Sequence, residues 1–420
     1  MTPNVQALRV LLVSQHFWPE SFRINDVAQS LHDAGHEVTV LTGQPNYPGG
    51  RVFEGYRAAA SGVERYGAIA VHRVPLVPRG DGSALRLVAN YLSFIASAAL
   101  FGAWRLRGRR FDVVFVYATS PLLQALAAIA LARMKGAAMV TWVQDLWPQS
   151  LEATGYVRSP RMLAAVAAVV RWIYAQQHLV LVQSPGFVSP VRALAPPNLP
   201  VRVHPNPAEA QCASVGAATL TLPAGFNIVF AGNLGKAQAL DSVLDAAELL
   251  RDLTGLRFVL VGSGQRSGWL AEQVRTRELG NVLLPGRYAP DQMPAILAQA
   301  QALLVSLVDD PAMALTVPSK VQSYLAAGKP VVAALRGEGA SVVAEAGAGL
   351  ACAPADAAAL AQVVRQLHAL PESERLRMGD AGRAYHHAHY APAVLTPRLV
   401  AHLHDAVGLA QGARTVGRRQ

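Results

Sequence analysis

Small residues and one lysine stand together at Ala231–Leu240, where the sequence is AGNLGKAQAL. Small residues let the backbone approach a ligand closely, and the free amides at a helix start attract an anion. Lys236 adds a positive charge, and Gly232 and Asn233 belong to the same turn. The segment therefore suits a diphosphate, although an ordinary strand-to-helix turn with a solvated lysine has the same pattern. It is not a Walker loop, because the GxxxxGK(S/T) motif is absent.

A second anion site is predicted within residues 317–331, VPSKVQSYLAAGKPV. The pattern indicates a short helix over Val321–Ala327 that ends at Gly328 and is followed by a strand. Ser319 and Lys320 stand at the start of this helix, where free amides and a positive charge favour an anion. Two phosphate-suited sites in one domain fit a nucleoside diphosphate better than a single phosphate.

One glutamate and one further glycine complete the expected nucleotide site. Glu338 stands between two glycines in the loop Arg336–Ala340 (RGEGA). A carboxylate there can accept hydrogen bonds from both hydroxyls of a ribose, or it can supply the negative charge at the start of the next helix. Gly262 follows the expected strand Arg257–Val261 and is assigned to the same site.

The elements that must position these residues follow an α/β rhythm. In the first half, the strand Leu8–Ser14, a helix near Asp26–Ala34 and the strand Glu37–Leu41 open a doubly wound sheet. Further expected strands are continuous apolar runs, typical of parallel strands buried on both faces, at Phe111–Tyr117, Ala138–Val143 and His178–Gln183. Ligands of such sheets bind beyond the carboxyl ends of the strands.

A Pro-rich stretch at Ala195–Pro207 interrupts this rhythm, which restarts with the strand Asn227–Ala231. We therefore predict two Rossmann-like domains, residues 1–207 and residues 216–388. Residues 389–420 are expected to carry a last helix, near Ala393–Leu409, that returns to the first domain.

Composition narrows the class of protein. The chain has 420 residues, of which 52% are hydrophobic and 15% charged, so it can form large cores and is not disordered. Cys212 and Cys352 lack metal-ligand spacing, so neither a zinc site nor a disulfide framework is expected. No signal peptide is visible, since Met1–Gln6 is polar and the first apolar run is short, and a cytosolic location is expected.

The net charge of +10 calls for an anionic partner. No nucleic-acid module and no basic run interleaved with aromatics is present, so nucleic acid is not expected. A membrane surface with anionic lipids and a substrate that carries a diphosphate explain the charge equally well.

Five segments together resemble a known family: LLVSQHFWPE, AGHEVTVLTGQPNYP, QDLWPQSL, FAGNLGKAQAL and PSKVQSYLAAGKPVVA. They are similar to retaining glycosyltransferases of family 4, which have the GT-B fold. The similarity is greatest to bacterial enzymes that assemble O-antigen, colanic acid or other surface polysaccharides, including N-acetylfucosamine transferases. It extends over nearly the whole chain in the expected order.

The resemblance implies a nucleotide-sugar donor, with a UDP-sugar favoured, held by the C-terminal domain. It implies a lipid-linked or saccharide acceptor held by the N-terminal domain, on the inner face of the bacterial cytoplasmic membrane. The transferred sugar is expected to be an N-acetylated aminodeoxyhexose and to keep its anomeric configuration, with no metal or other cofactor.

The chain departs from the family at one pair of positions. Many members carry two glutamates, eight positions apart, just ahead of the helix that ends in AAG. Leu315 and Ser323 stand at the corresponding positions. The family's donor contacts therefore do not carry over directly, and Lys320 and Glu338 are assigned in their place.

On the acceptor side, His16, Glu20 and Asp145 follow strands at their carboxyl ends and are assigned to catalysis. Either His16 or Glu20 is placed to orient the acceptor hydroxyl, although a histidine beside Phe17 and Trp18 is equally typical of a packed core. Asp145 can instead cap the following helix. No nucleophile is assigned. The two tryptophans that flank Asp145 are expected to form a stacking wall for a sugar, Trp142 and Trp147.

The longest apolar stretch is Val88–Trp104, and RLRGRR follows it. Its 17 residues lie at the lower limit of spanning length, so a helix that lies on the cytoplasmic leaflet is favoured over a span. The alternative is a buried helix followed by a basic surface turn.

Two other functions are compatible with these motifs. A nucleotide-sugar epimerase of the same two-domain form would bind a donor but no acceptor. A catalytically silent nucleotide-sugar-binding partner would explain the missing glutamate pair. Product analysis with and without a lipid-linked acceptor separates the three.

Overall fold

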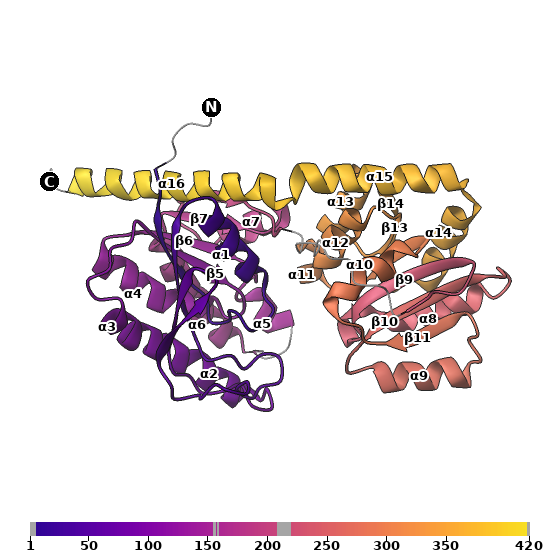
Figure 1. Ribbon diagram of the computed structural model, residues 1–420, viewed down its shortest axis with the longest axis horizontal. Helices are drawn as coiled ribbons and strands as arrows, with labels where there is room; N and C mark the ends of the chain where they lie inside the picture. The colour runs from indigo at the N-terminus through magenta and orange to yellow at the C-terminus, as the bar shows by residue number, and fades with distance from the viewer. Residues whose placement is uncertain (1–5, 154–156, 158, 208–219, 418–420) are drawn as a thin grey trace. The chain divides into compact units, whose positions relative to one another are not determined.

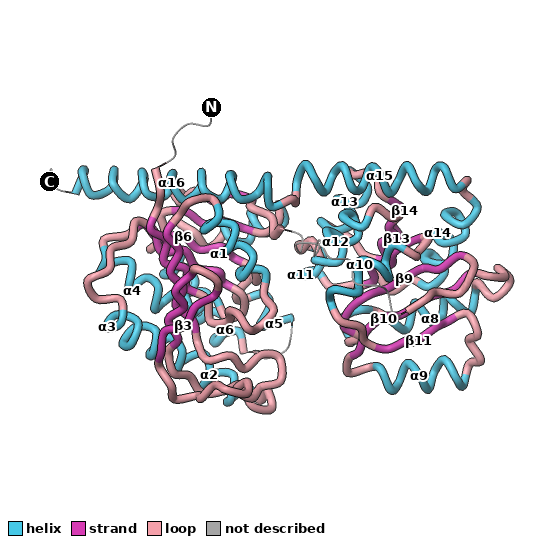
Figure 2. Tube along the Cα trace, in the orientation of Figure 1, coloured by secondary structure: helices cyan, strands magenta, loops and turns pink. Residues whose placement is uncertain are grey.

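The computed structural model describes residues 6–153, 157, 159–207 and 220–417. It divides into two compact units, of which unit 1 comprises Met1–Asn206 and Leu395–Gln420 and unit 2 comprises Pro207–Val394 (Figure 1). In each unit a sheet of strands is flanked by helices (Figure 2). Cys212 lies outside the described residues.

Unit 1 contains an eight-stranded sheet in the order β3-β4-β2-β1-β5-β6-β7-β8. All neighbouring strands are parallel except β3 and β4, which are antiparallel. The strands are β1 (Arg9–Val13), β2 (Glu37–Thr42), β3 (Gly62–Tyr66), β4 (Ile69–Arg73), β5 (Val113–Ala118), β6 (Ala138–Val143), β7 (Leu179–Val182) and β8 (Val201–Val203).

The helices of unit 1 cover both faces of this sheet. Side chains of α1 and α16 share one core with the strands, and α4 packs on β5 and β6 and contacts α2 and α6. A π-helical turn, Ala98–Gly102, joins α2 to α3. The helices are α1 (Arg23–Asp33), α2 (Ala84–Ser97), α3 (Ala103–Arg105), α4 (Ala125–Lys135), α5 (Gln149–Ala153), α6 (Pro160–Ala175), α7 (Val188–Arg192) and α16 (Pro392–Gly417).

Unit 2 contains a six-stranded parallel sheet in the order β11-β10-β9-β12-β13-β14. Its strands are β9 (Phe226–Asn233), β10 (Leu256–Ser263), β11 (Val282–Gly286), β12 (Ala302–Ser306), β13 (Val331–Ala334) and β14 (Gly349–Cys352). One core holds α8, α9 and α14, and another holds α10, α12 and α13. The helices are α8 (Leu240–Leu249), α9 (Ser267–Thr276), α10 (Met293–Ala298), α11 (Pro311–Ala314), α12 (Ser319–Ala327), α13 (Glu338–Glu345), α14 (Ala357–Ala369) and α15 (Glu372–His389).

The predicted fold class, two Rossmann-like sheets, is confirmed. The last helix is also where the sequence predicts it, because Leu399, Leu403 and Ala406 of α16 are buried in the core of unit 1. The prediction that β7 ends the first sheet is wrong. The Pro-rich stretch contains β8, whose Val201 is buried and which pairs with β7.

Candidate functional site

Two glycines at the carboxyl ends of β9 and β10 bring the chain into close contact. Gly232 and Gly262 are paired residues of the two strands, with φ angles of 143° and 145°. A Cβ on Gly262 would lie 1.8 Å from the carbonyl oxygen of Gly232, and a Cβ on Gly232 would lie 2.8 Å from Cε of Lys320. The positive φ angles and these close contacts require glycine at both positions, and the side chain of Lys320 fills the space beside Gly232.

Lys320 is the second residue of α12, and its side chain reaches the turn that precedes α8. Its Nζ donates a 2.7 Å hydrogen bond to Oε1 of Gln238 and lies 4.9 Å from the ring centroid of Phe230. Burial lowers the pKa of Lys320 to about 8. Among the described residues no carboxylate pairs with its ammonium. A cation at a helix N-terminus with no counter-charge has the chemistry of a phosphate site.

The predicted Gly-Lys segment has a different local structure from the one expected. Lys236 is exposed and opens a short 3-10 turn, Lys236–Gln238, and Ala239 with φ 46° separates this turn from α8. Lys236 is therefore not at the start of a helix. The hydrogen bond from Lys320 to Gln238 nevertheless brings the two predicted lysine segments together.

The other residues assigned to the nucleotide surround these strand ends. Asn233 is exposed at the end of β9, and its Oδ1 would lie 2.5 Å from a Cβ on Gly264. Ser319 is the exposed first residue of α12. Glu338 is the half-buried first residue of α13 and follows Gly337, whose φ is 73°.

Three residues of this site were missed in the sequence. Gln238 binds Lys320, Phe230 lies beneath its ammonium, and Tyr324 accepts a 2.8 Å hydrogen bond from the backbone N of Ala231. The tyrosine hydroxyl thereby fixes the carboxyl end of β9 to α12. The residue type gave little signal for it, since α12 contains several other polar side chains.

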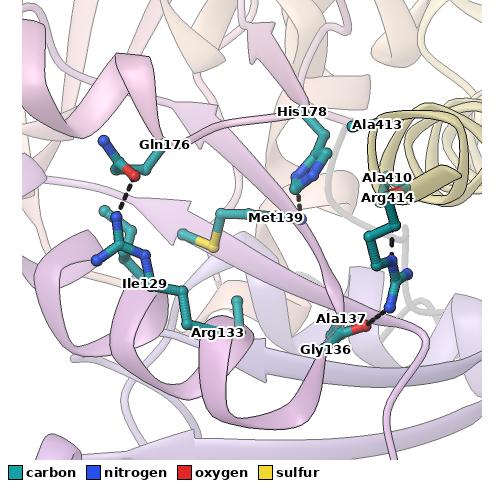
Figure 3. A pocket seen from close by; sticks show the side chains of 11 residues that line it. Ile129, Arg133, Gly136, Ala137, Met139, Gln176, His178, Ala410, Ala413 and Arg414 are labelled. Atoms are coloured by element: carbon teal, nitrogen blue, oxygen red, sulfur yellow. Dashed lines mark hydrogen bonds between the residues drawn. The ribbon is translucent and has the colours of Figure 1, made fainter. Parts of the chain in front are cut away.

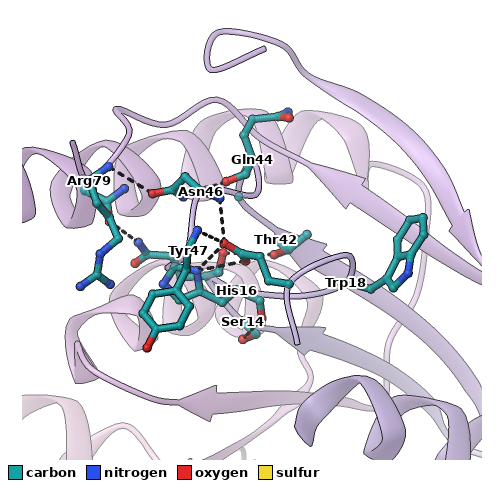
Figure 4. A network of polar contacts seen from close by, with 12 residues as sticks. Ser14, His16, Trp18, Thr42, Gln44, Asn46, Tyr47 and Arg79 are labelled. Carbon is teal, nitrogen blue, oxygen red and sulfur yellow. Dashed lines mark hydrogen bonds and ion pairs between the residues drawn. The ribbon is translucent and has the colours of Figure 1, made fainter. Parts of the chain in front are cut away.

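In unit 1, His16 and Glu20 form a buried pair (Figure 4). His16 Nδ1 lies 3.1 Å from both carboxylate oxygens of Glu20, and both residues are 2% exposed. Oε1 of Glu20 also accepts hydrogen bonds from the backbone N of Asn46 (2.8 Å) and of Tyr47 (2.7 Å). The structure brings together the two catalytic residues predicted in this loop and adds the loop after β2, which the sequence did not indicate.

Two polar atoms of this network have no partner among the described residues, His16 Nε2 and Gln15 Oε1. The remainder of Gln15 is satisfied, since its Nε2 donates to Oδ1 of Asn90 at 2.6 Å and its backbone N donates to Gln124. Buried polar atoms normally have partners, so these two atoms have hydrogen-bonding capacity that the described residues leave unused.

Asp145 is half-buried beyond β6, and its Oδ2 accepts hydrogen bonds from Oγ of Ser150 (3.1 Å) and Nε1 of Trp147 (3.3 Å). Its side chain thus fixes the loop ahead of α5. Nothing in the described part of the chain connects it to the His16–Glu20 pair.

The predicted tryptophan wall is wrong. Trp142 is 0% exposed, donates from Nε1 to the carbonyl of His204 at 2.8 Å, and packs on Phe115 and Tyr117 in the core. Trp147 is 5% exposed. Trp142 lies on a strand that is covered on both faces, and the ring of Trp147, in the loop after that strand, is held inside by hydrogen bonds from Nε1 to Ser120 and Asp145.

A pocket of about 280 Å³ lies at the opposite, amino ends of β6 and β7 (Figure 3). Arg414 crosses it and donates to the carbonyl of Gly136 at 2.8 Å, and His178 Nδ1 accepts from the backbone N of Met139 at 3.0 Å. None of the residues assigned to donor or acceptor lines this pocket. It is separate from the candidate site.

Among the described residues, no three or more His, Cys, Asp or Glu side chains form a cluster that could hold a metal ion. Cys352 is free and half-buried, and burial raises the pKa of its thiol to about 11.

The apolar stretch of unit 1 forms one continuous helical segment, Ala84–Arg105, with a mean hydropathy of 1.5 over its most apolar window, of which 22% is buried. By length and composition it is the one segment in the described chain that could cross a membrane. The buried-helix alternative is wrong, because large apolar side chains are exposed along it: Leu85, Val88, Leu92, Leu100, Phe101 and Trp104.

The four arginines at the end of this segment and directly after it are not equivalent. Arg105 is fixed to Ser61 by hydrogen bonds from Nε (2.7 Å) and Nη2 (2.8 Å), and Arg109 reaches Oγ1 of Thr39. Arg107 and Arg110 are exposed.

Two units, each with a largely parallel sheet flanked by helices, define the GT-B class of fold. Residues 21–207 match the family described as glycosyl transferase 4-like domain, and residues 225–369 match the family described as glycosyl transferases group 1. The first match lies almost entirely in unit 1 and the second in unit 2, so each unit contains a domain that is similar to glycosyltransferases.

Known proteins that are similar to this chain include the following three. A putative colanic acid biosynthesis glycosyl transferase of Escherichia coli K12, WcaI, is 28% identical over 341 residues, 76% of this chain and 82% of its own. The structure of Anabaena HepE in complex with UDP has 13% identity and a TM-score of 0.65, covering 94% of this chain and 99% of HepE. WaaG, a glycosyltransferase involved in lipopolysaccharide biosynthesis, has 15% identity and a TM-score of 0.62, covering 92% and 98%.

Proposed function

We propose that this protein transfers a sugar, with retention of configuration, from a nucleoside diphosphate donor held by unit 2 to a saccharide acceptor held by unit 1. The observation that carries the donor assignment is Lys320, a buried ammonium without a carboxylate partner at the N-terminus of α12. Because Gly232 has no side chain, the ammonium of Lys320 lies directly beside the carboxyl end of β9. A UDP-sugar is favoured, and the likeness to a UDP-bound structure supports it.

In the proposed reaction, the bond from the anomeric carbon to the leaving phosphate breaks, and a bond to the acceptor oxygen forms on the same face of the sugar. The acceptor proton passes to the leaving phosphate. Lys320 and the amides that open α12 stabilise the charge that develops on that phosphate. No nucleophile, metal or other cofactor is part of this proposal.

The acceptor is proposed to be lipid-linked, and the product to be a surface polysaccharide or lipopolysaccharide precursor carrying an N-acetylated aminodeoxyhexose. Relatives described as colanic acid and lipopolysaccharide glycosyltransferases support this assignment. The exposed apolar side of Ala84–Arg105 supports a peripheral position on the inner face of the cytoplasmic membrane.

The test is thermal stabilisation by a panel of UDP- and GDP-sugars, followed by product analysis. A ligand at about 100 times its Kd adds about 2.7 kcal/mol to the free energy of unfolding. Transfer only when a lipid-linked acceptor is present supports the proposal. A new sugar epimer without acceptor identifies an epimerase, and binding without any product identifies a silent partner.

A further inference from the structure

Tyr47 presents an open aromatic ring at the carboxyl end of β2. The residue is 40% exposed, whereas its ring packs against His16 (centroids 5.5 Å apart) and Phe22 (5.2 Å). Its backbone N donates to Glu20 at 2.7 Å. The ring thus packs on the buried His16 and the half-buried Phe22, while the residue as a whole remains exposed (Figure 4).

Arg79 is fixed beside this ring by the backbone. Its guanidinium carbon lies 5.3 Å from the Tyr47 centroid, and its backbone N donates to Oδ1 of Asn46 at 3.1 Å. Gly80 N donates to the carbonyl of Gly50 at 2.8 Å, at a contact so close that a Cβ on Gly50 would lie 1.8 Å from the Gly80 oxygen. Backbone hydrogen bonds thus join the loops after β2 and β4, and the guanidinium of Arg79 lies next to the ring of Tyr47 without a ligand.

The charge of Arg79 has no partner. In the part of the chain that the structure describes, its guanidinium pairs with no carboxylate. Arg73 offers a direct comparison, since its guanidinium also lies over a tyrosine ring, that of Tyr56 at 4.9 Å, but it forms an ion pair with Glu64. The charge of Arg73 is neutralised by Glu64, so its contact with Tyr56 is structural. The charge of Arg79 beside Tyr47 remains available to an anion.

The orphaned nitrogen of His16 lies behind the same ring. Oε1 of Glu20 accepts hydrogen bonds from two backbone amides, and both carboxylate oxygens lie 3.1 Å from Nδ1 of His16. Nε2 of His16 has no partner among the described residues. The ring of Tyr47, the guanidinium of Arg79 and Nε2 of His16 thus form one group of neighbouring side chains.

We infer that Tyr47 and Arg79 bind a glycosyl phosphate, with the C–H face of the sugar ring on Tyr47 and the phosphate on Arg79. The planar guanidinium matches two phosphate oxygens, and the ring supplies rigid apolar area. This inference rests on the proposed function, because it assigns the anionic end of the acceptor to these two residues. It also replaces Trp142 and Trp147 with Tyr47 as the aromatic surface for the sugar.

The test is a titration of the 15N-histidine-labelled full chain, with saturating UDP present to occupy unit 2. The probes are N-acetylglucosamine 1-phosphate and N-acetylglucosamine, and the His16 ring signals, assigned with His16→Gln, report binding in unit 1. We expect the phosphate ester to bind at least about 10-fold more tightly than the free sugar, since a charge-assisted contact is lost without it. Arg79→Gln should remove this difference, and Arg57→Gln, an exposed charge-matched control, should preserve it.

Tyr47→Phe should leave both affinities nearly unchanged, whereas Tyr47→Ala should weaken both probes. Equal binding of the two probes to the wild type, or equal effects of Arg79→Gln and Arg57→Gln, would overturn the phosphate assignment. Absence of any His16 shift up to about 20 mM probe, above the millimolar Kd expected of a fragment, would overturn the whole subsite. Failure of the proposed function is seen separately, as absence of UDP binding to unit 2 in a calorimetric titration.

Discussion

The ammonium of Lys320 donates a 2.7 Å hydrogen bond to the side-chain oxygen of Gln238, 82 positions earlier in the chain. This bond joins the N-terminus of α12 to the turn that follows β9. Since Gln238 is neutral, it does not cancel the positive charge of the lysine at the carboxyl edge of the sheet, where ligands of such folds bind. The first two predictions concern this charge.

Lys320→Met should weaken donor binding about 10- to 150-fold, because a charge-assisted hydrogen bond contributes about 1.5–3 kcal/mol. Methionine keeps most of the apolar stem against Phe230, so the fold should be retained. Lys236→Ala is expected to weaken binding in the same range if its exposed ammonium also reaches a phosphate. Calorimetric titration with the nucleotide decides both. Unchanged affinity in both variants would remove the diphosphate assignment.

Donor affinity should fall as pH rises through about 8, because the lysine with its lowered pKa then loses its proton. For the free protein the sign is opposite. The folded pKa lies below the ordinary value of 10.5, so the unfolded chain binds more protons between about pH 8 and 10.5, and stability contributed by this group rises over that window. Affinity and urea unfolding measured from about pH 7 to 10 check both trends. Lys320→Met should remove both, and persistence of either trend in that variant would assign it to another group.

Asp145→Asn should lower turnover about 10-fold or more while leaving nucleotide affinity unchanged, because Asp145 belongs to unit 1. Ser150→Ala is the matched control, since it removes the 3.1 Å hydrogen bond to the same carboxylate oxygen without removing the charge. Steady-state kinetics and nucleotide titration are needed for both variants. If the two reduce turnover equally, Asp145 only fixes its loop. If nucleotide binding is lost, the assignment of donor and acceptor to separate units is wrong.

Trp142→Phe should destabilise the fold by about 1–3 kcal/mol, because it removes the hydrogen bond to His204 and leaves that carbonyl buried. Trp172→Phe is the control, with a ring that is 45% exposed and an expected effect within about 0.5 kcal/mol. Urea unfolding measures both. Full stability of Trp142→Phe together with weakened acceptor binding would restore the sugar-wall role that the structure rejects.

The contrast between these tryptophans shows where the sequence was sufficient. Continuous apolar runs predicted β1, β5, β6 and β7, because parallel strands are buried on both faces. Because both faces of such a strand are apolar, the sequence does not indicate which face a side chain occupies. Trp142 could therefore be assigned to a strand, but its burial in the core could not be predicted. β3 was not predicted because its side chains are alternately half-buried and exposed, in a short and mostly polar segment.

The site divides in the same way. Glycines and lysines near strand ends were recognisable, because their chemistry follows from residue type and local order. Gln238, Tyr47 and Arg79 were not recognisable, because the role of each depends on residues that are distant in the sequence. Gln238 accepts a hydrogen bond from Lys320, and the backbone of Arg79 donates one to Asn46. Glu20 is intermediate, since its position after β1 was noticed but its two backbone partners after β2 were not.

The last prediction is that the protein binds anionic vesicles peripherally through Ala84–Arg105 and the arginines that follow. Apolar side chains recur on its exposed side at a spacing of mostly three or four residues, among them Leu92 (56% exposed) and Leu100 (71%). A helix with such a stripe binds at the lipid interface, and nearby arginines each add about 1 kcal/mol at an anionic surface.

Because Arg105 is hydrogen-bonded to Ser61, only Arg107 and Arg110 can be replaced without loss of such contacts. Arg107→Gln/Arg110→Gln should therefore lower vesicle binding about 30-fold. Arg51→Gln/Arg57→Gln should lower it little, and Leu100→Glu should lower it strongly by removing apolar contact. Pelleting with anionic and neutral vesicles at low and high salt is the measurement, since surface attraction is screened over about 8 Å at physiological salt. Retention on the vesicles through high salt and carbonate would instead identify a spanning helix, and no pelleting of the wild type would show that another partner covers this apolar side.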